Sequence, residues 1–238
     1  MRAVLRRERN DELPRVAAGI VDAMRIAVLG TGDVGRTLAS RLVELGHEVT
    51  LGSRSATNEA AVGWLKSLST AERAAVGTFA DAAAGAELVV NATAGTASLD
   101  ALALTGADNL AGKILLDVAN PLTFADGVPT LTVCNTDSLG ERIQRAFPGA
   151  RVVKSLNTVN CQVMARPDLV GGPHTMFVAG EDADAKATVT SLLREFGWRD
   201  IADLGGIEAA RGLEMHIALW IRLRPAGGSN LFNLQVVT

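Results

Sequence analysis

The sequence has little of what marks several classes of protein. Its two cysteines, Cys134 and Cys161, lack the spacing of metal ligands, so neither a zinc site nor a disulfide framework is predicted. Such cysteine usage fits the reducing cytoplasm. The formal net charge is -3, and no cluster of lysine and arginine offers the basic face that nucleic acids or anionic membranes need. The apolar run at residues 213–223 is broken by charged residues and is too short to span a bilayer.

A long apolar stretch is also missing from residues 1–23. This segment is charged at its front and lacks the unbroken apolar run of a signal peptide. It precedes Met24, where the first strand is expected. We therefore predict that residues 1–23 are a disordered extension, or follow an over-called start codon, and we assign them no function.

The rest of the chain alternates between strand-like and helix-like segments. Strands are expected at residues 24–29, 48–51, 76–79, 88–91, 114–118 and 151–155, with helices at 33–45, 59–68, 81–84, 98–104 and 137–147. Asn58 is the expected cap of the second of these helices. Such alternation predicts an α/β fold, a Rossmann-type doubly wound parallel sheet, over residues 24–155.

The pattern changes after Ser155. Residues 175–179 and 199–202 look like strands on either side of a helix at 183–196, and an apolar helix follows at 207–222. Residues 156–238 are therefore predicted to form a small C-terminal α/β subdomain, packed on the sheet, that lines the acceptor cleft and mediates dimerisation.

A glycine-rich turn follows the first expected strand. It reads Gly30-Thr31-Gly32-Asp33-Val34-Gly35, a match to the G-x-G-x-x-G pattern. The first glycine allows the tight turn, the second lets the backbone approach a pyrophosphate, and the third lets the helix pack close to the strand. The pyrophosphate then binds N–H groups at the start of the helix, where the helix dipole is positive. Because the turn lies inside a βαβ unit, it predicts a dinucleotide site.

The end of the second strand favours NADP(H) over NAD(H). An NAD site usually has Asp or Glu there, about 20 residues after the turn, to bond the ribose hydroxyls. Here the residues are Leu51-Gly52-Ser53-Arg54, without a carboxylate. Arg54 can make a forked, charge-assisted bond to a 2′-phosphate, and Ser53 can add a hydroxyl. The alternative is a solvated surface arginine.

Three polar loops follow the later strands of the predicted sheet. Ligands in such sheets bind outside the carboxyl ends of the strands, so these loops are candidates to surround the nicotinamide and to let the dinucleotide pass close to the backbone. Ordinary turn chemistry is the alternative for each loop. The candidate cofactor-binding residues in them are Ala92, Thr93, Ala94, Ala119, Asn120, Pro121, Asn157 and Thr158.

No side chain stands out as a proton donor, and we assign no catalytic residue. His47 is expected in an exposed turn, His174 in a loop, and His216 as a packed residue of the C-terminal helix. Beyond residue 150 the only lysines are Lys154 and Lys186, and Lys154 is an outside candidate. Hydroxy-acid dehydrogenases need such a donor beside the substrate. A hydride transfer between two cofactors does not, because there the protein supplies orientation.

Several motifs resemble those of the NADPH-dependent coenzyme F420 reductases. The resemblance covers Met24 to Thr238 and implies a Rossmann domain with a small C-terminal domain, a homodimer, and hydride transfer between NADPH and a deazaflavin. It also implies that Thr31, Ser53 and Arg54 hold the 2′-phosphate. Archaeal members have lysine in place of Asn58 and histidine in place of Asn157. The motifs are the glycine turn, Gly46-His47-Glu48-Val49, Gly52-Ser53-Arg54, Asp117-Val118-Ala119-Asn120-Pro121-Leu122, Lys154-Ser155-Leu156-Asn157-Thr158, residues 206–223 and Asn230-Leu231-Phe232-Asn233.

The predicted function is therefore an NADP-dependent oxidoreductase that transfers a hydride between NADPH and coenzyme F420 or a related flavin, its small-molecule partner. Two alternatives stay open. One is an NADPH-dependent reductase of a small imine or keto acid, although those enzymes carry a longer all-helical C-terminal domain. The other is a non-enzymatic module that senses NADP(H). No metal, nucleic acid or membrane partner is predicted.

Overall fold

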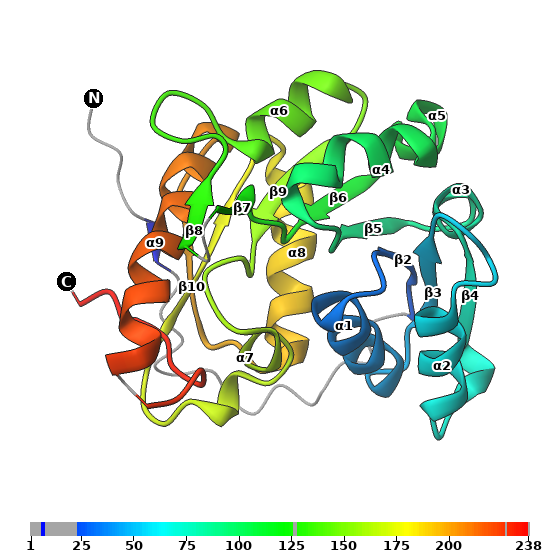
Figure 1. Ribbon diagram of the computed structural model, residues 1–238, viewed down its shortest axis with the longest axis horizontal. Helices are drawn as coiled ribbons and strands as arrows, with labels where there is room; N and C mark the ends of the chain where they lie inside the picture. The colour runs from blue at the N-terminus through cyan, green and yellow to red at the C-terminus, as the bar shows by residue number, and fades with distance from the viewer. Residues whose placement is uncertain (1–5, 8–22, 126–127, 227, 238) are drawn as a thin grey trace.

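The chain is described here from a computed structural model, which places residues 6–7, 23–125, 128–226 and 228–237. Nine strands form one sheet in the order β1-β11-β10-β9-β6-β5-β2-β3-β4 (Figure 1). The six strands from β9 to β4 are parallel. The strands of this sheet are β1 (Arg6–Arg7), β2 (Arg25–Leu29), β3 (Glu48–Ser53), β4 (Ala74–Thr78), β5 (Leu88–Asn91), β6 (Ile114–Asp117), β9 (Arg151–Ser155), β10 (Thr175–Ala179) and β11 (Asp200–Asp203).

Helices cover both faces of the sheet, as the doubly wound prediction requires. The alternation of side chains along β2 shows why: Ile26 and Val28 enter one core, while Ala27 and Leu29 enter the other. Helices α1, α2, α7 and α8 pack on the first core, and α3 to α6 with the start of α9 pack on the second. The helices are α1 (Asp33–Glu44), α2 (Glu59–Ser67), α3 (Phe79–Ala84), α4 (Ser98–Thr105), α5 (Ala107–Leu110), α6 (Leu139–Ala146), α7 (Cys161–Ala165), α8 (Ala183–Phe196) and α9 (Ala210–Ala226).

The predicted Rossmann-type α/β fold is thereby confirmed. The parallel strands follow an order that reverses between β2 and β5, because the chain winds outward from β2 to one side and then returns to the other. In folds of this kind, ligands bind at such a switch point, outside the carboxyl ends of the strands. The glycine turn after β2 and the loop after β5 both lie there.

The elements after Ser155 extend the same sheet. Strand β10 pairs antiparallel with β9, and β11 runs parallel to β10. At the outer edge, Arg6 and Arg7 pair antiparallel with β11, through Asp203 and Ala202. Apart from residues 6, 7 and 23, the extension that we predicted to be disordered lies outside the described residues. No helix in the described part of the chain has the length and hydropathy needed to cross a bilayer.

Most predicted elements occur within a few residues of their expected bounds, but several elements were missed and one boundary was wrong. The hairpin of β7 (Leu122–Ala125) and β8 (Val128–Leu131), the short helices α5 and α7 and the two-residue strand β1 were not predicted. Phe79 was placed in a strand, yet it begins α3. Thr78 caps that helix and exchanges hydrogen bonds with Asp81 in a capping box, which ends the strand one residue earlier.

Asn58 caps α2 as predicted. Its Oδ1 accepts a hydrogen bond of 3.0 Å from the backbone N–H of Ala61. The side chain is therefore committed to the helix start. Short 3-10 turns complete the fold at Ala71–Arg73, Gly95–Ala97, Pro167–Leu169 and Ile207–Ala209.

An ion pair joins α6 to α9. The carboxylate of Glu141 accepts hydrogen bonds of 2.8 Å from Nε of Arg211 and 2.8 Å from Oγ of Ser138, the residue that caps α6. The hydrogen bond from Arg211 is the main cause that holds the pKa of Glu141 below its usual value of 4.5. The pair therefore favours the ionised carboxylate in the folded protein.

The free energy of unfolding is therefore expected to fall at low pH, because Glu141 is then protonated. When folding lowers the pKa of a carboxyl group, the ionised group stabilises the folded protein. This stabilisation is fully present above the pKa of the unfolded state and is lost as the pH falls through the pKa of the folded state. Because Arg211 is partly exposed, we expect Glu141→Gln to cost about 1–2 kcal/mol at neutral pH, or roughly 2–8 °C in Tm. Thermal unfolding of both proteins from neutral pH to below the usual value of 4.5 checks this. A Tm difference that stays constant over this range would contradict it.

Candidate functional site

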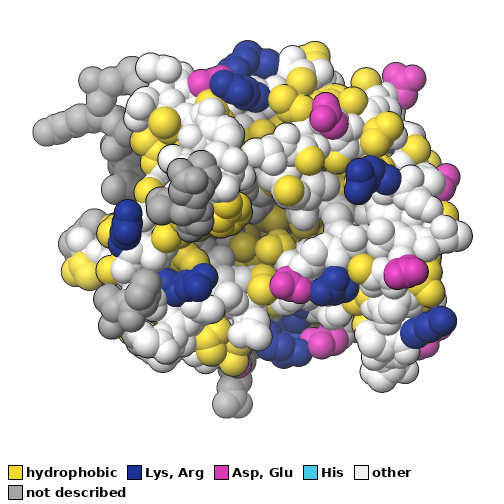
Figure 2. All heavy atoms as spheres, viewed as in Figure 1, with side chains coloured by type: hydrophobic (Ala, Val, Ile, Leu, Met, Phe, Trp, Pro, Cys, Tyr) yellow, Lys and Arg dark blue, Asp and Glu magenta, His cyan; other side chains and the backbone are white. Residues whose placement is uncertain are grey.

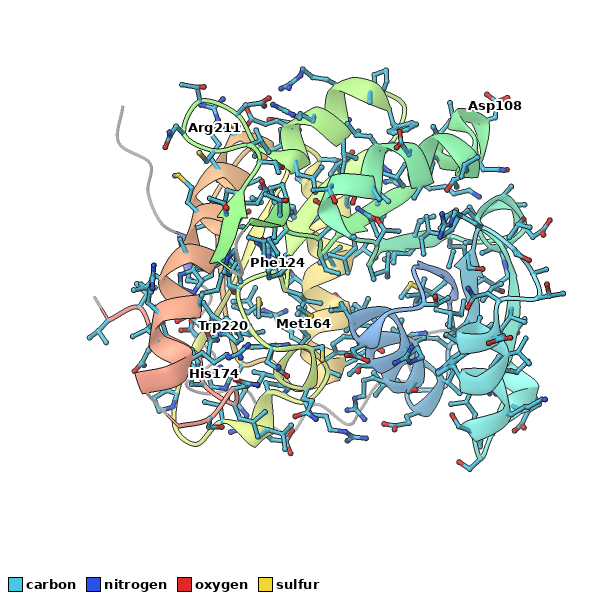
Figure 3. The ribbon with its side chains drawn as sticks, in the orientation of Figure 1. Asp108, Phe124, Met164, His174, Arg211 and Trp220 are labelled. Atoms are coloured by element: carbon cyan, nitrogen blue, oxygen red, sulfur yellow. The ribbon has the colours of Figure 1, made fainter. Side chains whose placement is uncertain are left out.

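The face that carries the carboxyl ends of the parallel strands is hollowed. Figure 2 shows a hollow in the middle of this face with hydrophobic side chains on its floor. In Figure 1 the same place lies between α1 and α9, above α7. Figure 3 shows Phe124, Met164 and Trp220 around it, from β7, α7 and α9. Phe124 is 70% exposed, which leaves a large apolar surface beside the hollow.

The glycine turn at the end of β2 is built by close backbone contacts. Gly30 has φ +114, and a Cβ there would lie 2.5 Å from the carbonyl oxygen of Ala92. A Cβ at Gly35 would lie 1.9 Å from the carbonyl oxygen of Gly30. The first and third glycines are therefore required by the packing of the turn against α1 and the loop after β5.

The second glycine is different. A Cβ at Gly32 would meet nothing within 4 Å, and the residue has φ -71, which any residue can adopt. Gly32 is the N-cap of α1, and no side chain caps the helix there. The start of α1 thus has open space beside Gly32 and no capping side chain, at the positive end of the helix dipole, as an anion site requires. Thr31, Asp33 and Val34 complete the turn.

At the end of β3, Ser53 and Arg54 differ in whether their polar atoms are free to bind a phosphate. The hydroxyl of Ser53 is buried, donates to the carbonyl oxygen of Ser55 at 2.6 Å and accepts from the N–H of Ser55 at 3.2 Å. Arg54 is exposed, and no described residue forms a hydrogen bond or ion pair with its guanidinium. A second guanidinium, that of Arg36, donates to the carbonyl oxygen of Thr31 at 2.6 Å. Arg36 was not among the residues predicted from the sequence to bind the cofactor.

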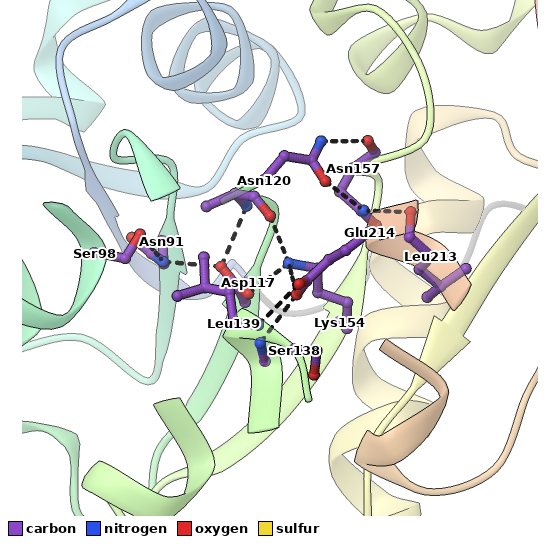
Figure 4. A network of polar contacts seen from close by, with 12 residues as sticks. Asn91, Ser98, Asp117, Asn120, Ser138, Leu139, Lys154, Asn157, Leu213 and Glu214 are labelled. Carbon is purple, nitrogen blue, oxygen red and sulfur yellow. Dashed lines mark hydrogen bonds and ion pairs between the residues drawn. The ribbon is translucent and has the colours of Figure 1, made fainter. Parts of the chain in front are cut away.

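The three predicted loops meet. Gly95, after β5, lies so close to the loop after β6 that a Cβ there would be 2.0 Å from the carbonyl oxygen of Asn120. Nδ2 of Asn120 donates to the carbonyl oxygen of Asn157 at 2.8 Å, and Nδ2 of Asn157 donates to Oδ1 of Asn120 at 2.9 Å (Figure 4). Ala92, Ala119 and Pro121 are buried in these loops, whereas Thr93 is half-buried and Ala94 is exposed.

Two buried polar atoms in the third loop have no partner. Asn157 and Thr158 are each 1% exposed. Oδ1 of Asn157 and Oγ1 of Thr158 form no hydrogen bond with any described residue. The amide nitrogen of Asn157 is already engaged, since it also donates to the carbonyl oxygen of Leu213 at 3.0 Å. A buried polar group without a partner costs about 1–3 kcal/mol, so both atoms are candidates to bond a ligand.

A buried charge network lies directly beneath these loops. Nζ of Lys154 lies 2.8 Å from Oδ2 of Asp117 and 2.9 Å from Oε1 of Glu214, and all three side chains are buried (Figure 4). Burial opposes the charge of Lys154, but the two carboxylates outweigh it and raise the pKa of the lysine. Lys154 also donates to the carbonyl oxygen of Ala119. Its ammonium is thus fully engaged, which argues against the proton-donor role considered for it.

The histidines do not supply a donor in its place. The prediction that His47 is exposed was wrong. It is 1% exposed, accepts from the N–H of Met24 at 3.2 Å and contacts Glu195 at 3.1 Å, because α8 packs over the turn. His174 packs edge-on against Trp198. His216 is half-buried on α9, and burial lowers its pKa.

Comparison with known proteins identifies the family of the chain. The family model described as NADP oxidoreductase, coenzyme F420-dependent, matches residues 25–121. A protein of Arthrobacter sp. FB24, whose crystal structure carries the name F420-dependent NADP-reductase, is 51% identical, with a TM-score of 0.86 over 91% of this chain and 100% of that one.

Two curated proteins extend the comparison. The F420-dependent NADP reductase of Methanothermobacter marburgensis is 31% identical over 84% of this chain and 92% of its own length. Metalloreductase STEAP3 of Rattus norvegicus is also 31% identical, over 86% of this chain, but the match spans only 38% of that protein. The chain therefore belongs to the family of coenzyme F420-dependent NADP oxidoreductases, and it is an NADP-dependent oxidoreductase.

Proposed function

We propose that the chain binds NADP(H) along the carboxyl edge of its sheet and exchanges a hydride between the nicotinamide and coenzyme F420 or a related flavin. One observation carries this proposal. At a single edge, an open helix start and an arginine lie at one end and two buried polar atoms lie at the other, and neither the arginine nor these atoms have a partner among the described residues. That spacing of polar groups along the switch point suits a dinucleotide.

The phosphate end of the site is assigned to α1 and Arg54. The pyrophosphate would bond the N–H groups of Gly32 and the first turn of α1, and the guanidinium of Arg54 would fork onto the 2′-phosphate. The hydroxyl of Ser53 already donates to Ser55. We therefore propose that Ser53 stabilises the conformation of the loop that carries Arg54, and that the hydroxyl of Thr31 bonds the 2′-phosphate.

The nicotinamide end is assigned to the three loops. The carboxamide of the nicotinamide would donate to Oδ1 of Asn157 and contact Oγ1 of Thr158, which would satisfy both buried atoms. NADPH would supply the hydride, and the acceptor would take up one proton from water. The chain then needs no general acid beside the ring, which agrees with the engagement of Lys154 by Asp117 and Glu214. Orientation and exclusion of water are the tasks left to the loops.

The proposal is tested by measuring NADPH oxidation with coenzyme F420, riboflavin phosphate, a ferric chelate and a quinone in parallel. Turnover with coenzyme F420 is the expected result. Turnover confined to riboflavin phosphate or the ferric chelate would make the protein a flavin or ferric reductase. Consumption of NADPH by a small imine or keto acid alone, or tight binding without any consumption, would overturn the proposal.

Gly32→Ala is expected to weaken NADPH binding while it leaves the fold intact. Its methyl group would enter open space and so would not strain the protein, but it would stand where the pyrophosphate approaches the helix start. The loss of about one hydrogen bond to a charged group predicts a Kd about tenfold higher. Titration of both proteins with NADPH, with thermal unfolding alongside, measures this.

Gly63→Ala is the matched control, since Gly63 also faces open space, on α2. It should leave the Kd for NADPH unchanged. An unchanged Kd for Gly32→Ala as well would show that the pyrophosphate does not lie on α1.

A further inference from the structure

The C-terminal tail, residues 228–237, is fixed to the start of β10 by several hydrogen bonds. The N–H of Thr175 donates to the carbonyl oxygen of Leu234 at 2.9 Å, and the N–H of Val236 donates to Oγ1 of Thr175 at 3.1 Å. Nδ2 of Asn233 bonds the carbonyl oxygen of Thr175 at 2.9 Å and Nδ1 of His174 at 3.1 Å. Such a set of bonds is unusual for a terminus, which is usually poorly ordered unless tied down.

Two ring contacts continue this attachment. Trp220 of α9 stacks on Phe232 of the tail, with ring centroids 5.4 Å apart. His174 packs edge-on against Trp198, at 5.0 Å, while its Nε2 bonds the carbonyl oxygen of Pro167 at 3.1 Å. The imidazole that holds Asn233 is therefore itself held on its other side. The tail is held in place because it contacts two fixed side chains, Trp220 through Phe232 and His174 through Asn233.

The fixed tail completes a cavity beside the glycine turn. The cavity has a volume of about 530 Å³ and lies between the first turns of α1, the start of α7 and the tail. Asp33 and Thr37 come from α1, Cys161 and Gln162 from α7, Asn230 and Leu231 from the tail, and Asn160 stands two residues after Thr158. The cavity thus borders the loop assigned to the nicotinamide.

The chemistry of this lining selects against a phosphate. Among the described residues no lysine or arginine lines the cavity, and the carboxylate that does, that of Asp33, is already paired with Arg36 at 2.7 Å. The side-chain amides of Gln162 and Asn230 bond no other described residue. The side-chain amides and the hydroxyl of Thr37 can both donate and accept hydrogen bonds. They therefore suit a ligand with several neutral hydroxyl groups, each of which also donates and accepts.

We propose that this cavity receives the hydroxylated chain that flavins and deazaflavins carry on their central ring nitrogen, and that the tail is therefore part of the acceptor site. This inference rests on the proposed function. Asn230 contacts the chain directly, and Asn233 and His174 are positioning residues that hold Asn230 in place. The ring itself would lie in the apolar hollow next to the nicotinamide.

The test compares riboflavin with lumiflavin, which has the same ring but a methyl group in place of the hydroxylated chain. Their dissociation constants are measured on the NADP⁺-saturated protein. The wild type should bind riboflavin more tightly. Asn230→Ala and Asn233→Ala should each weaken riboflavin binding about three- to tenfold, the effect of one lost hydrogen bond, and leave lumiflavin binding unchanged.

Gln235→Ala, an exposed tail residue, is the control and should alter neither constant. Asn233→Ala should also change the fluorescence of Trp220, since release of the tail removes Phe232 from its ring, whereas Asn230→Ala should not. Equal binding of the two flavins by the wild type, or equal losses for both flavins in the variants, would overturn the proposal. Selective riboflavin binding without any turnover would refute the proposed hydride transfer alone.

Discussion

Lys154→Met is expected to destabilise the protein by about 3–5 kcal/mol, or roughly 6–20 °C in Tm. Methionine fills the volume of the lysine stem but removes its charge. Asp117 and Glu214, which are 0% and 1% exposed, would then be left buried without a cation. Glu214 also accepts from the N–H groups of Leu139 and Gly140 at 2.8 and 3.0 Å, and these bonds compensate only part of the loss.

Denaturant unfolding of both proteins measures the difference. Lys186→Met is the matched control, because Lys186 pairs with Asp203 at 2.9 Å but the carboxylate is 41% exposed. The Lys186 side chain is 13% exposed, so the pair is only partly solvated, and a pair near the surface is worth about 0–1 kcal/mol. If the two variants lose equal stability, the buried contacts of Lys154 with Asp117 and Glu214 stabilise the protein no more than the pair of Lys186 and Asp203 does.

Arg54→Ala is expected to reduce the preference for NADPH over NADH by about one to two decades. A hydrogen bond to a charged group contributes about 1.5–3 kcal/mol, and each 1.4 kcal/mol is about tenfold in Kd. The guanidinium has no partner among the described residues, so its removal disturbs nothing else that the structure describes. The affinity for NADH, which lacks the 2′-phosphate, should stay the same.

Titration of the wild type and the variant with both nicotinamides tests this. Arg142→Ala, which removes an exposed arginine from α6, should change neither Kd. If Arg54→Ala keeps the full preference for NADPH, the 2′-phosphate is held elsewhere, and Arg36 beside Thr31 becomes the next residue to replace.

The parts of the fold that the sequence predicted well are those with strong local signals. Helix α1 carries Leu38 and Leu42 on one face and follows a glycine turn, and it occurs where expected. The hairpin after β6 carries no such signal, since its strands have four residues each and Pro129 argues against a strand. The short helix α7 is too brief for a helical period to appear.

Only those features of the site that depend on the backbone could be predicted from the sequence. The open start of α1 follows from the glycine pattern, and the meeting of the three loops follows from parallel strands. The burial of His47 and the network of Lys154 depend on Glu195 and Glu214, which come from helices far along the chain. No local pattern places those carboxylates. The homodimer and the cytoplasmic location stay predictions, although α9 does expose Met215 and Leu219.

The continuity of the sheet has a consequence for how the two ligands exchange. Val178 and Ala179 of β10 are hydrogen-bonded to Ser155 and Lys154 of β9, so the half that carries α9 and the tail shares one sheet with the half that carries the glycine turn. In the described part of the chain, no flexible hinge therefore separates the two halves. Under the proposed function, binding and release of the nicotinamide and of the acceptor would therefore depend on local movements of side chains and loops rather than on the rotation of one half of the sheet against the other.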